Sequence, residues 1–237
     1  MTIGIIAAMD KEIKKYKEMF ELIKINEKLN IYEGNYQDKK IILCLSGIGK
    51  VNAAITTQYL IDIYHPDYII NSGCAGSLTE NVKVLDTILV DSACYHDFTP
   101  IRIMESCTPD NGKIKTNETL LNKAKEILDK QNIPYHIGGI TSGDCFVTSS
   151  SMRDDIYSRT NSLAVDMESA SIGHTAKKNN VPFLIIRSIS DFADGVEEQE
   201  EQAANISASL VKEIISNKNI WYNLRIFIIA IAYIYYT

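Results

Sequence analysis

The sequence predicts an α/β fold in which a largely parallel, buried β-sheet carries helices on both faces. Short runs of β-branched residues alternate with amphipathic stretches, and no repeat, low-complexity tract or linker interrupts the alternation. This pattern is typical of parallel sheets, because the helices that connect parallel strands cover both faces of the sheet. We therefore expect a single domain over residues 1–218.

Each expected element has a local signal. Branched apolar residues mark strands at residues 3–7, 31–36, 41–45, 68–71, 86–94, 135–141 and 183–190, and the second and third of these would form a hairpin. Helices are expected at residues 11–23, 51–63, 117–129, 164–178 and 198–215. In the first helix apolar side chains recur at helical spacing up to Ile23, and Pro66 halts the second.

Composition excludes several classes of partner and cofactor. The net charge is −6, from 24 basic and 30 acidic residues without a basic run, so we expect no nucleic acid partner. The amino terminus opens as a strand with neither a basic segment nor a cleavage site, which predicts a cytoplasmic protein without a signal peptide. The five cysteines form no CxxC pair and the four histidines lack metal-ligand spacing. We expect reduced, mostly buried thiols, no metal and no cofactor.

The last segment differs from the rest of the chain. Residues 220–236 are almost wholly apolar, interrupted by Asn223 and Arg225, and the uninterrupted apolar part spans only residues 226–236. A helix that crosses a bilayer needs about 20 residues. A membrane anchor is therefore disfavoured, and residues 219–237 are interpreted as an atypical hydrophobic C-terminal tail, either covered by a partner or a non-native extension.

Acidic residues lie at three of the expected strand ends, which is where ligands bind in such sheets. Glu12 lies in the first turn of a helix, where Asp10 is the expected N-cap and the helix dipole favours a carboxylate. Glu168 enters a helix rich in small residues, and Asp191 follows the last strand. Taken singly, each could also be an ordinary acid at a helix start or a turn.

Arg187 and two loops of small residues lie close to these acids in the sequence or in the expected fold. An arginine inside an apolar strand needs a paired carboxylate, and Glu168 is the expected partner. Glycines in the loops at residues 46–50 and 71–77 let a backbone approach a ligand closely, although neither loop matches a phosphate-binding or dinucleotide fingerprint. Phe146 could be a core residue or a stacking platform.

Taken in order, seven stretches of the chain resemble the methylthioadenosine/S-adenosylhomocysteine nucleosidases of the nucleoside phosphorylase superfamily. The stretches are residues 3–12, 46–50, 71–76, 95–97, 142–146, 165–168 and 187–191. The resemblance implies a nucleoside-phosphorylase-like three-layer fold with a central mixed, largely parallel sheet flanked by helices, usually as a homodimer. It also implies hydrolysis of the N-glycosidic bond of 5′-methylthioadenosine and S-adenosylhomocysteine, in methionine salvage, with water as co-substrate.

The resemblance further implies roles for three catalytic residues. It assigns Glu12 to activating the attacking water, Glu168 to the ribose hydroxyls and Asp191 to protonating the departing adenine. These roles fit the chemistry, because cleavage develops an oxocarbenium-like sugar and negative charge on the base. Substrate contacts would come from Met9, Ile48, Cys74, Ala75, Gly76, Phe146, Val147, Met167, Arg187 and Ser190, with Phe146 stacking on the purine and Arg187 helping to place Glu168.

The sequence also departs from the family pattern in three places. Asp166 and Cys74 stand where glutamate and serine are common, and residues 98–105 replace a glycine- and tyrosine-rich loop that covers the 5′ substituent. The choice among methylthioadenosine, S-adenosylhomocysteine and 5′-deoxyadenosine therefore stays open. Two alternatives to hydrolysis also stay open: a purine nucleoside or methylthioadenosine phosphorylase, and a non-catalytic nucleoside-binding protein.

Overall fold

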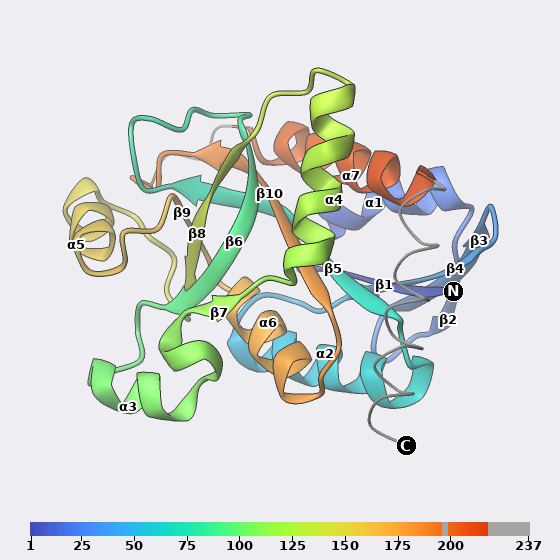
Figure 1. Cartoon of the computed structure of the whole chain (residues 1–237), viewed down its shortest axis with the longest axis horizontal. Helices are drawn as coiled ribbons and strands as arrows, with labels where there is room; N and C mark the ends of the chain where they lie inside the picture. The colour runs from blue at the N-terminus through green and yellow to red at the C-terminus, as the bar shows by residue number, and fades with distance from the viewer. Residues whose placement is uncertain (196–198, 218–237) are drawn as a thin grey trace.

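The computed structural model describes residues 1–195 and 199–217, and the hydrophobic tail expected at residues 219–237 lies outside them. Helices flank a central β-sheet (Figure 1). The strands are β1 Thr2–Ala7, β2 Ile23–Asn26, β3 Ile31–Tyr36, β4 Lys39–Leu45, β5 Tyr68–Ser77, β6 Thr87–Tyr95, β7 Ile114–Lys115, β8 His136–Ser142, β9 Ala164–Asp166 and β10 Phe183–Asp191. The helices are α1 Asp10–Phe20, α2 Lys50–Tyr64, α3 Ile101–Cys107, α4 Glu118–Lys130, α5 Ser150–Thr160, α6 Ser169–Lys178 and α7 Glu200–Ser216, with a 3₁₀ turn at Pro109–Gly112.

The sheet is mixed, and parallel strands form its centre. β1 lies between β4 and β5 and is parallel to both, and β5 is also parallel to β10. Antiparallel pairing of β10 with β6 and of β5 with β9, together with the parallel β6–β8 and β8–β9 pairs, closes one end of the sheet into a ring. The predicted fold class is confirmed.

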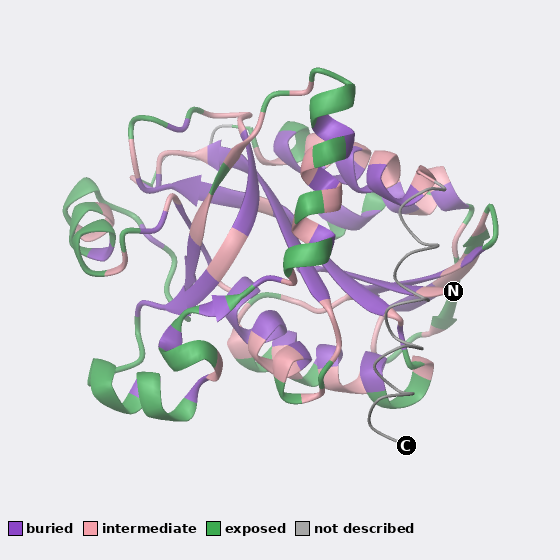
Figure 2. Ribbon diagram, in the orientation of Figure 1, coloured by how far each residue is buried: buried purple, intermediate pink, exposed green. Residues whose placement is uncertain are grey.

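Two helical layers bury the two faces of the sheet. Along β1, Ile3 and Ile5 pack in a core with α1, α4 and α7, whereas Ile6 packs on the other side with α2 and α6. This alternation follows from the period of two of a β-strand. The strands are buried through most of their length, while the outer faces of the helices are exposed (Figure 2). Such a sheet holds its strand ends rigidly.

Several predicted boundaries were wrong for identifiable reasons. α1 ends at Phe20, because Glu21 adopts a left-handed conformation (φ 49°), and Ile23 instead begins β2 with 68% of its surface exposed. The small-residue segment at residues 71–77 is not a loop but the second half of β5. The helix expected from residue 164 begins at Ser169, after the short strand β9. The sequence patterns missed α3, α5, β2, β7 and β9. Residue 198, the expected start of the last helix, lies outside the described residues.

The cysteines are free thiols, as expected, but two of them are exposed. Cys44 and Cys94 are buried and Cys74 is partly buried, whereas Cys107 and Cys145 lie at the surface. The expectation of mostly buried thiols was therefore too broad.

Candidate active site

A cavity of about 560 Å³ opens where several strands end. Its wall is built from the segment after β1, the ends of β5, β9 and β10, the loop after β4 and the loop after β8. Every predicted site residue except Arg187 lines it: Met9, Glu12, Ile48, Cys74, Ala75, Gly76, Phe146, Val147, Met167, Glu168, Ser190 and Asp191. Residues separated by up to 182 positions in the sequence therefore meet in one place, as the strand-end rule predicts.

Glu12 is a buried carboxylate held by backbone donors. One oxygen, Oε2, accepts hydrogen bonds from the N–H groups of Ala8 (2.8 Å) and Met9 (3.0 Å). The other, Oε1, accepts one from the N–H of Cys74 (2.9 Å) and is 3.5 Å from the Cys74 thiol. The N-cap of α1 is Met9 and not Asp10, so the prediction for Asp10 was wrong. Glu12 itself satisfies the free N–H groups at the start of the helix.

The Cys74 thiol stays protonated beside Glu12. Burial and the neighbouring Glu12 carboxylate both raise its pKa well above the usual value of a thiol. Its Sγ can therefore donate a weak hydrogen bond to the carboxylate, in place of the stronger one that a serine hydroxyl would give.

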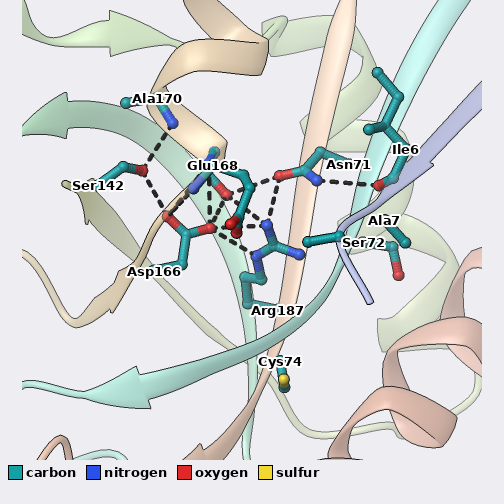
Figure 3. Close-up of polar contacts among 12 residues, drawn as sticks. Ile6, Ala7, Asn71, Ser72, Cys74, Ser142, Asp166, Glu168, Ala170 and Arg187 are labelled. Atoms are coloured by element: carbon teal, nitrogen blue, oxygen red, sulfur yellow. Dashed lines mark hydrogen bonds and ion pairs between the residues drawn. The ribbon is translucent and has the colours of Figure 1, made fainter. Parts of the chain in front are cut away.

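The partner of Arg187 is Asp166, which corrects the prediction of a pair with Glu168. The Arg187 Nε and Nη2 atoms donate to Asp166 Oδ2 at 3.0 and 2.8 Å, and Nη2 also lies 2.9 Å from Asn71 Oδ1 and 3.0 Å from Ser169 Oγ (Figure 3). The Ser142 and Ser169 hydroxyls donate to Asp166 as well, so both of its oxygens are used. Burial alone would lower the pKa of Arg187, but Asp166, Glu12 and Glu168 together raise it. The guanidinium is charged and almost fully buried, and it lies behind the residues that line the cavity.

Glu168 lies between the end of β9 and the start of α6 and makes a different contact from Asp166. Its Oε1 accepts a hydrogen bond from the Gly49 N–H at 2.8 Å, which ties it to the small-residue loop after β4. Burial, reinforced by the nearby Asp166 carboxylate, raises the pKa of Glu168 to about 8, although Arg187 and the Gly49 N–H act in the opposite direction. Arg187 does not hydrogen-bond to Glu168, so it acts on this carboxylate only through Asp166 and through its charge.

Asp191 ends β10 and lines the same cavity. Its Oδ2 accepts a hydrogen bond from the Ser190 hydroxyl (2.7 Å), and its Oδ1 accepts one from the Ala193 N–H (2.8 Å). Gly76 lies against it: a Cβ added to this glycine would be 3.0 Å from Asp191 Oδ1. Phe146, with 53% of its surface exposed, lines the same cavity and offers a free ring. The Asp191 carboxyl group, fixed by two hydrogen bonds, and the Phe146 ring therefore line the same cavity.

Seven residues that line the cavity were not predicted as site residues: Ala8, Lys11, Cys145, Val165, Asp166, Ala193 and Glu200. Lys11 and Glu200 form an ion pair between the starts of α1 and α7, and both line the cavity. Nothing in the periodicity of either helix indicates the pair, because the two residues are 189 positions apart and both positions read as ordinary helix-surface residues. Residues 95–97, a stretch that carried the family resemblance, do not line the cavity; Asp97 instead binds Lys50 (2.6 Å) and the N–H of Asp144 (2.8 Å).

Comparisons with known proteins agree with this architecture. A family model described as "Phosphorylase superfamily" matches residues 2–216. The 5′-methylthioadenosine/S-adenosylhomocysteine nucleosidase of Buchnera aphidicola is 38% identical over 200 residues, which cover 82% of this chain and 85% of that protein. The chain belongs to this nucleosidase family of the phosphorylase superfamily.

Solved structures of the nucleosidase family and of a related hydrolase share the fold. An aspartate-to-asparagine variant of the Helicobacter pylori nucleosidase, with 5′-methylthioadenosine in its active site, has a TM-score of 0.82 and 32% identity, and covers 91% of this chain and 98% of that one. A futalosine hydrolase variant from the same organism has a TM-score of 0.85 and 31% identity, with 91% and 99% covered. Like these relatives, the chain is a nucleosidase-family α/β protein, as the motifs predicted.

Residues 1–195 and 199–217 contain neither a candidate metal site nor a candidate membrane-spanning helix. No group of histidine, cysteine or acidic side chains there has the geometry to hold a metal ion. No helix in those ranges is both long enough and apolar enough to cross a membrane.

Proposed function

We propose that this protein hydrolyses the N-glycosidic bond of 5′-methylthioadenosine and S-adenosylhomocysteine, releasing adenine and the thioribose product. Family membership supports an adenine nucleoside with a 5′-thioether as substrate, since the relatives are named for these two compounds. The choice of water over phosphate as the attacking group is supported by the carboxylates of the cavity.

Hydrolysis is supported over phosphorolysis by the hydrogen bonds that the backbone N–H groups around the cavity already make. A phosphorylase needs free N–H groups or arginines at its small-residue loops to hold phosphate. Here the N–H groups of Ala8, Met9 and Cys74 all bind Glu12, and that of Gly49 binds Glu168. The chain's own carboxylates thus occupy the positions that would otherwise attract an anion, and they repel phosphate. This supports hydrolysis.

In the proposed mechanism three carboxyl groups act on one bond. Glu12 accepts a proton from a water molecule whose oxygen attacks C1′, and the C1′–N9 bond breaks as its electron pair moves into the purine. Asp191 delivers a proton to N7 of that purine, so that neutral adenine leaves. The Glu168 carboxyl group binds the ribose hydroxyls, to which it can hydrogen-bond in either protonation state.

The other predicted site residues contact the nucleoside or position a catalytic group. Phe146 stacks on the purine, the Val147 backbone reads its edge, Met167 packs on the ribose, and Ser190 orients Asp191. Met9, Ile48, Cys74, Ala75 and Gly76 complete the wall around the nucleoside. Arg187 contributes indirectly, because it holds Asp166 at the start of α6 and thereby fixes the segment that carries Met167 and Glu168.

We also propose that the protein acts in methionine salvage, as a homodimer in the cytoplasm. Large apolar side chains are exposed on α2 and on α3: Val51 (67%), Ile55 (56%), Ile101 (51%) and Ile103 (45%). Exposed apolar side chains of this size are typical of an interface when they form one patch. A molar mass measured by light scattering should correspond to two chains, and Val51→Asp with Ile55→Asp should give one.

The decisive assay incubates the protein with methylthioadenosine in the presence and absence of inorganic phosphate. We expect adenine and free methylthioribose at the same rate in both. Dependence on phosphate, with a sugar 1-phosphate as product, would identify a phosphorylase. Tight binding of the nucleoside without turnover would identify a non-catalytic binding protein.

A further inference from the structure

The cavity wall contains one feature that the proposed mechanism does not use, the Lys11–Glu200 ion pair. The Lys11 ammonium contacts Glu200 Oε2, and the two side chains are 36% and 17% exposed. Both residues line the cavity together with Met9 and Glu12. The pair joins the first turns of α1 and α7, which pack side by side on one face of the sheet (Figure 1).

The proposed roles leave one part of the substrate without a partner. The purine is assigned to Phe146 and Asp191, the ribose hydroxyls to Glu168, and the attacking water to Glu12. Met9, Ile48, Lys11 and Glu200 are among the lining residues without one of these roles, and Met9, Lys11 and Ile48 also line one adjoining pocket. The part of the substrate not yet assigned is the 5′ substituent. The apolar Met9 and Ile48 side chains suit a thioether, and the charged pair suits a charged end beyond it.

The charges of the cavity make the position of Lys11 unusual. Among the described residues that line the cavity, Lys11 is the single cation, whereas Glu12, Asp166, Glu168, Asp191 and Glu200 are acids. Arg187 neutralises Asp166, Glu200 is paired with Lys11, and Glu12 is held by backbone N–H groups. Among the described lining residues, a carboxylate on a ligand can therefore meet a cation only beside Lys11.

We propose that the Lys11–Glu200 pair binds the amino-acid end of the 5′ substituent and so favours S-adenosylhomocysteine over methylthioadenosine. The α-carboxylate accepts hydrogen bonds from the Lys11 ammonium, and the α-ammonium group donates to Glu200, which gives a cluster of two positive and two negative charges. Opening the existing pair costs little, because a partly exposed ion pair contributes little to stability. The methyl end of methylthioadenosine offers neither charge. This inference rests on the proposed nucleosidase function.

The test compares substrate preference in four single variants. Lys11→Gln and Glu200→Gln remove one charge each from the pair. Lys14→Gln and Glu201→Gln are matched controls, because Lys14 and Glu201 also join α1 to α7 (3.3 Å) but are 67% and 65% exposed and do not line the cavity. For each protein the ratio of kcat/KM for S-adenosylhomocysteine to kcat/KM for methylthioadenosine is measured, with thermal melting as a check on folding.

We expect this ratio to fall about fivefold to tenfold in Lys11→Gln and in Glu200→Gln, and to stay at the wild-type value in both controls. Two substrate analogues that each carry only one of the two charges separate the two contacts. Lys11→Gln should selectively lower the rate of hydrolysis of the 5′-(3-carboxypropylthio) analogue. Glu200→Gln should selectively lower that of the 5′-(3-aminopropylthio) analogue.

Two results would overturn the inference, and they differ from a failure of the proposed function. If both rates fall by one factor and the ratio is unchanged, the pair only holds α1 against α7. If the controls change the ratio as much as the cavity variants do, the effect comes from the general field of the two helices. A wild-type protein that hydrolyses neither nucleoside would instead refute the nucleosidase proposal itself.

Discussion

Gly73 offers the sharpest test of the geometry around Glu12. It lies in β5, immediately before Cys74, with its Cα facing two buried charged groups. A Cβ added there would be 2.1 Å from Glu12 Oε1 and 2.5 Å from Arg187 Nη1. Since carbon and oxygen atoms pack at about 3.5 Å, the Gly73→Ala variant requires the Glu12 carboxylate to retreat by about 1 Å or more. That movement breaks its 2.9 Å hydrogen bond to the Cys74 N–H.

The expected cost follows from this displacement. A misplacement of about 1 Å in a group that must hold the attacking water lowers the rate about 100-fold. Overpacking of the core costs a further ~1–3 kcal/mol in the free energy of unfolding. We therefore expect kcat/KM for methylthioadenosine to fall by two orders of magnitude in Gly73→Ala, while the protein remains folded with a lower melting temperature.

A second glycine provides the control. Gly139 lies in β8. The atom nearest to a Cβ added there would be Ser162 Oγ, at 3.3 Å, so this neighbour would need to shift by only a few tenths of an ångström. Gly139 does not line the cavity, so Gly139→Ala should keep the wild-type rate. A Gly73→Ala protein with a rate within threefold of wild type would refute the assignment of Glu12 as the water-activating base at this position.

Two further predictions concern the other carboxyl groups. Asp191→Asn should lower kcat about 100-fold to 10,000-fold, because an amide cannot deliver a proton to the purine; wild-type turnover would contradict the general-acid role, and retained binding of adenine by calorimetry would show that the site is intact. The pKa of Glu168 is raised to about 8, so the folded protein binds the proton of this residue more tightly than the unfolded chain does. The stability that this proton contributes is therefore lost as the pH rises from about 4.5 through 8. Melting curves should show Glu168→Gln gaining at least ~1 kcal/mol relative to wild type between pH 5 and 9, and a difference that is constant with pH would contradict this.

The strands and most helices could be predicted from the sequence because their signals are local. The buried β1 and β4 are runs of branched residues, and Asn117 caps α4 through its side chain, as residue type and position indicate. The failures share a cause. At residues 71–77 small polar residues indicate a loop, but pairing of β5 with β10 and β9 extends the strand through them. Long-range pairing overrides local propensity there.

Most of the predicted site residues line one cavity, but the hydrogen bonds among them could not be predicted. The sequence correctly indicated that Arg187 needs a carboxylate, and two acids at positions 166 and 168 were available. The directions of two side chains two positions apart, between β9 and α6, decide between them: Asp166 binds Arg187 of β10, and Glu168 binds the N–H of Gly49. No periodic pattern encodes that choice. The Lys11–Glu200 pair was missed for a similar reason, because it depends on how two helix starts pack.

The occupied backbone donors around Glu12 also bear on the compounds that a cell holds in excess. Adenine nucleotides share the purine and the ribose with the proposed substrates and differ only by phosphate groups at the 5′ position. The backbone amides around Glu12 are taken by that carboxylate, so they offer such groups no neutral donors to replace their hydration. Beside Lys11 a 5′-phosphate also meets Glu200, and unlike an amino-acid end it carries no ammonium group to offset that charge. For an enzyme that breaks the bond between adenine and ribose, this rejection by charge would protect the nucleotide pool from destruction without any need for a steric gate.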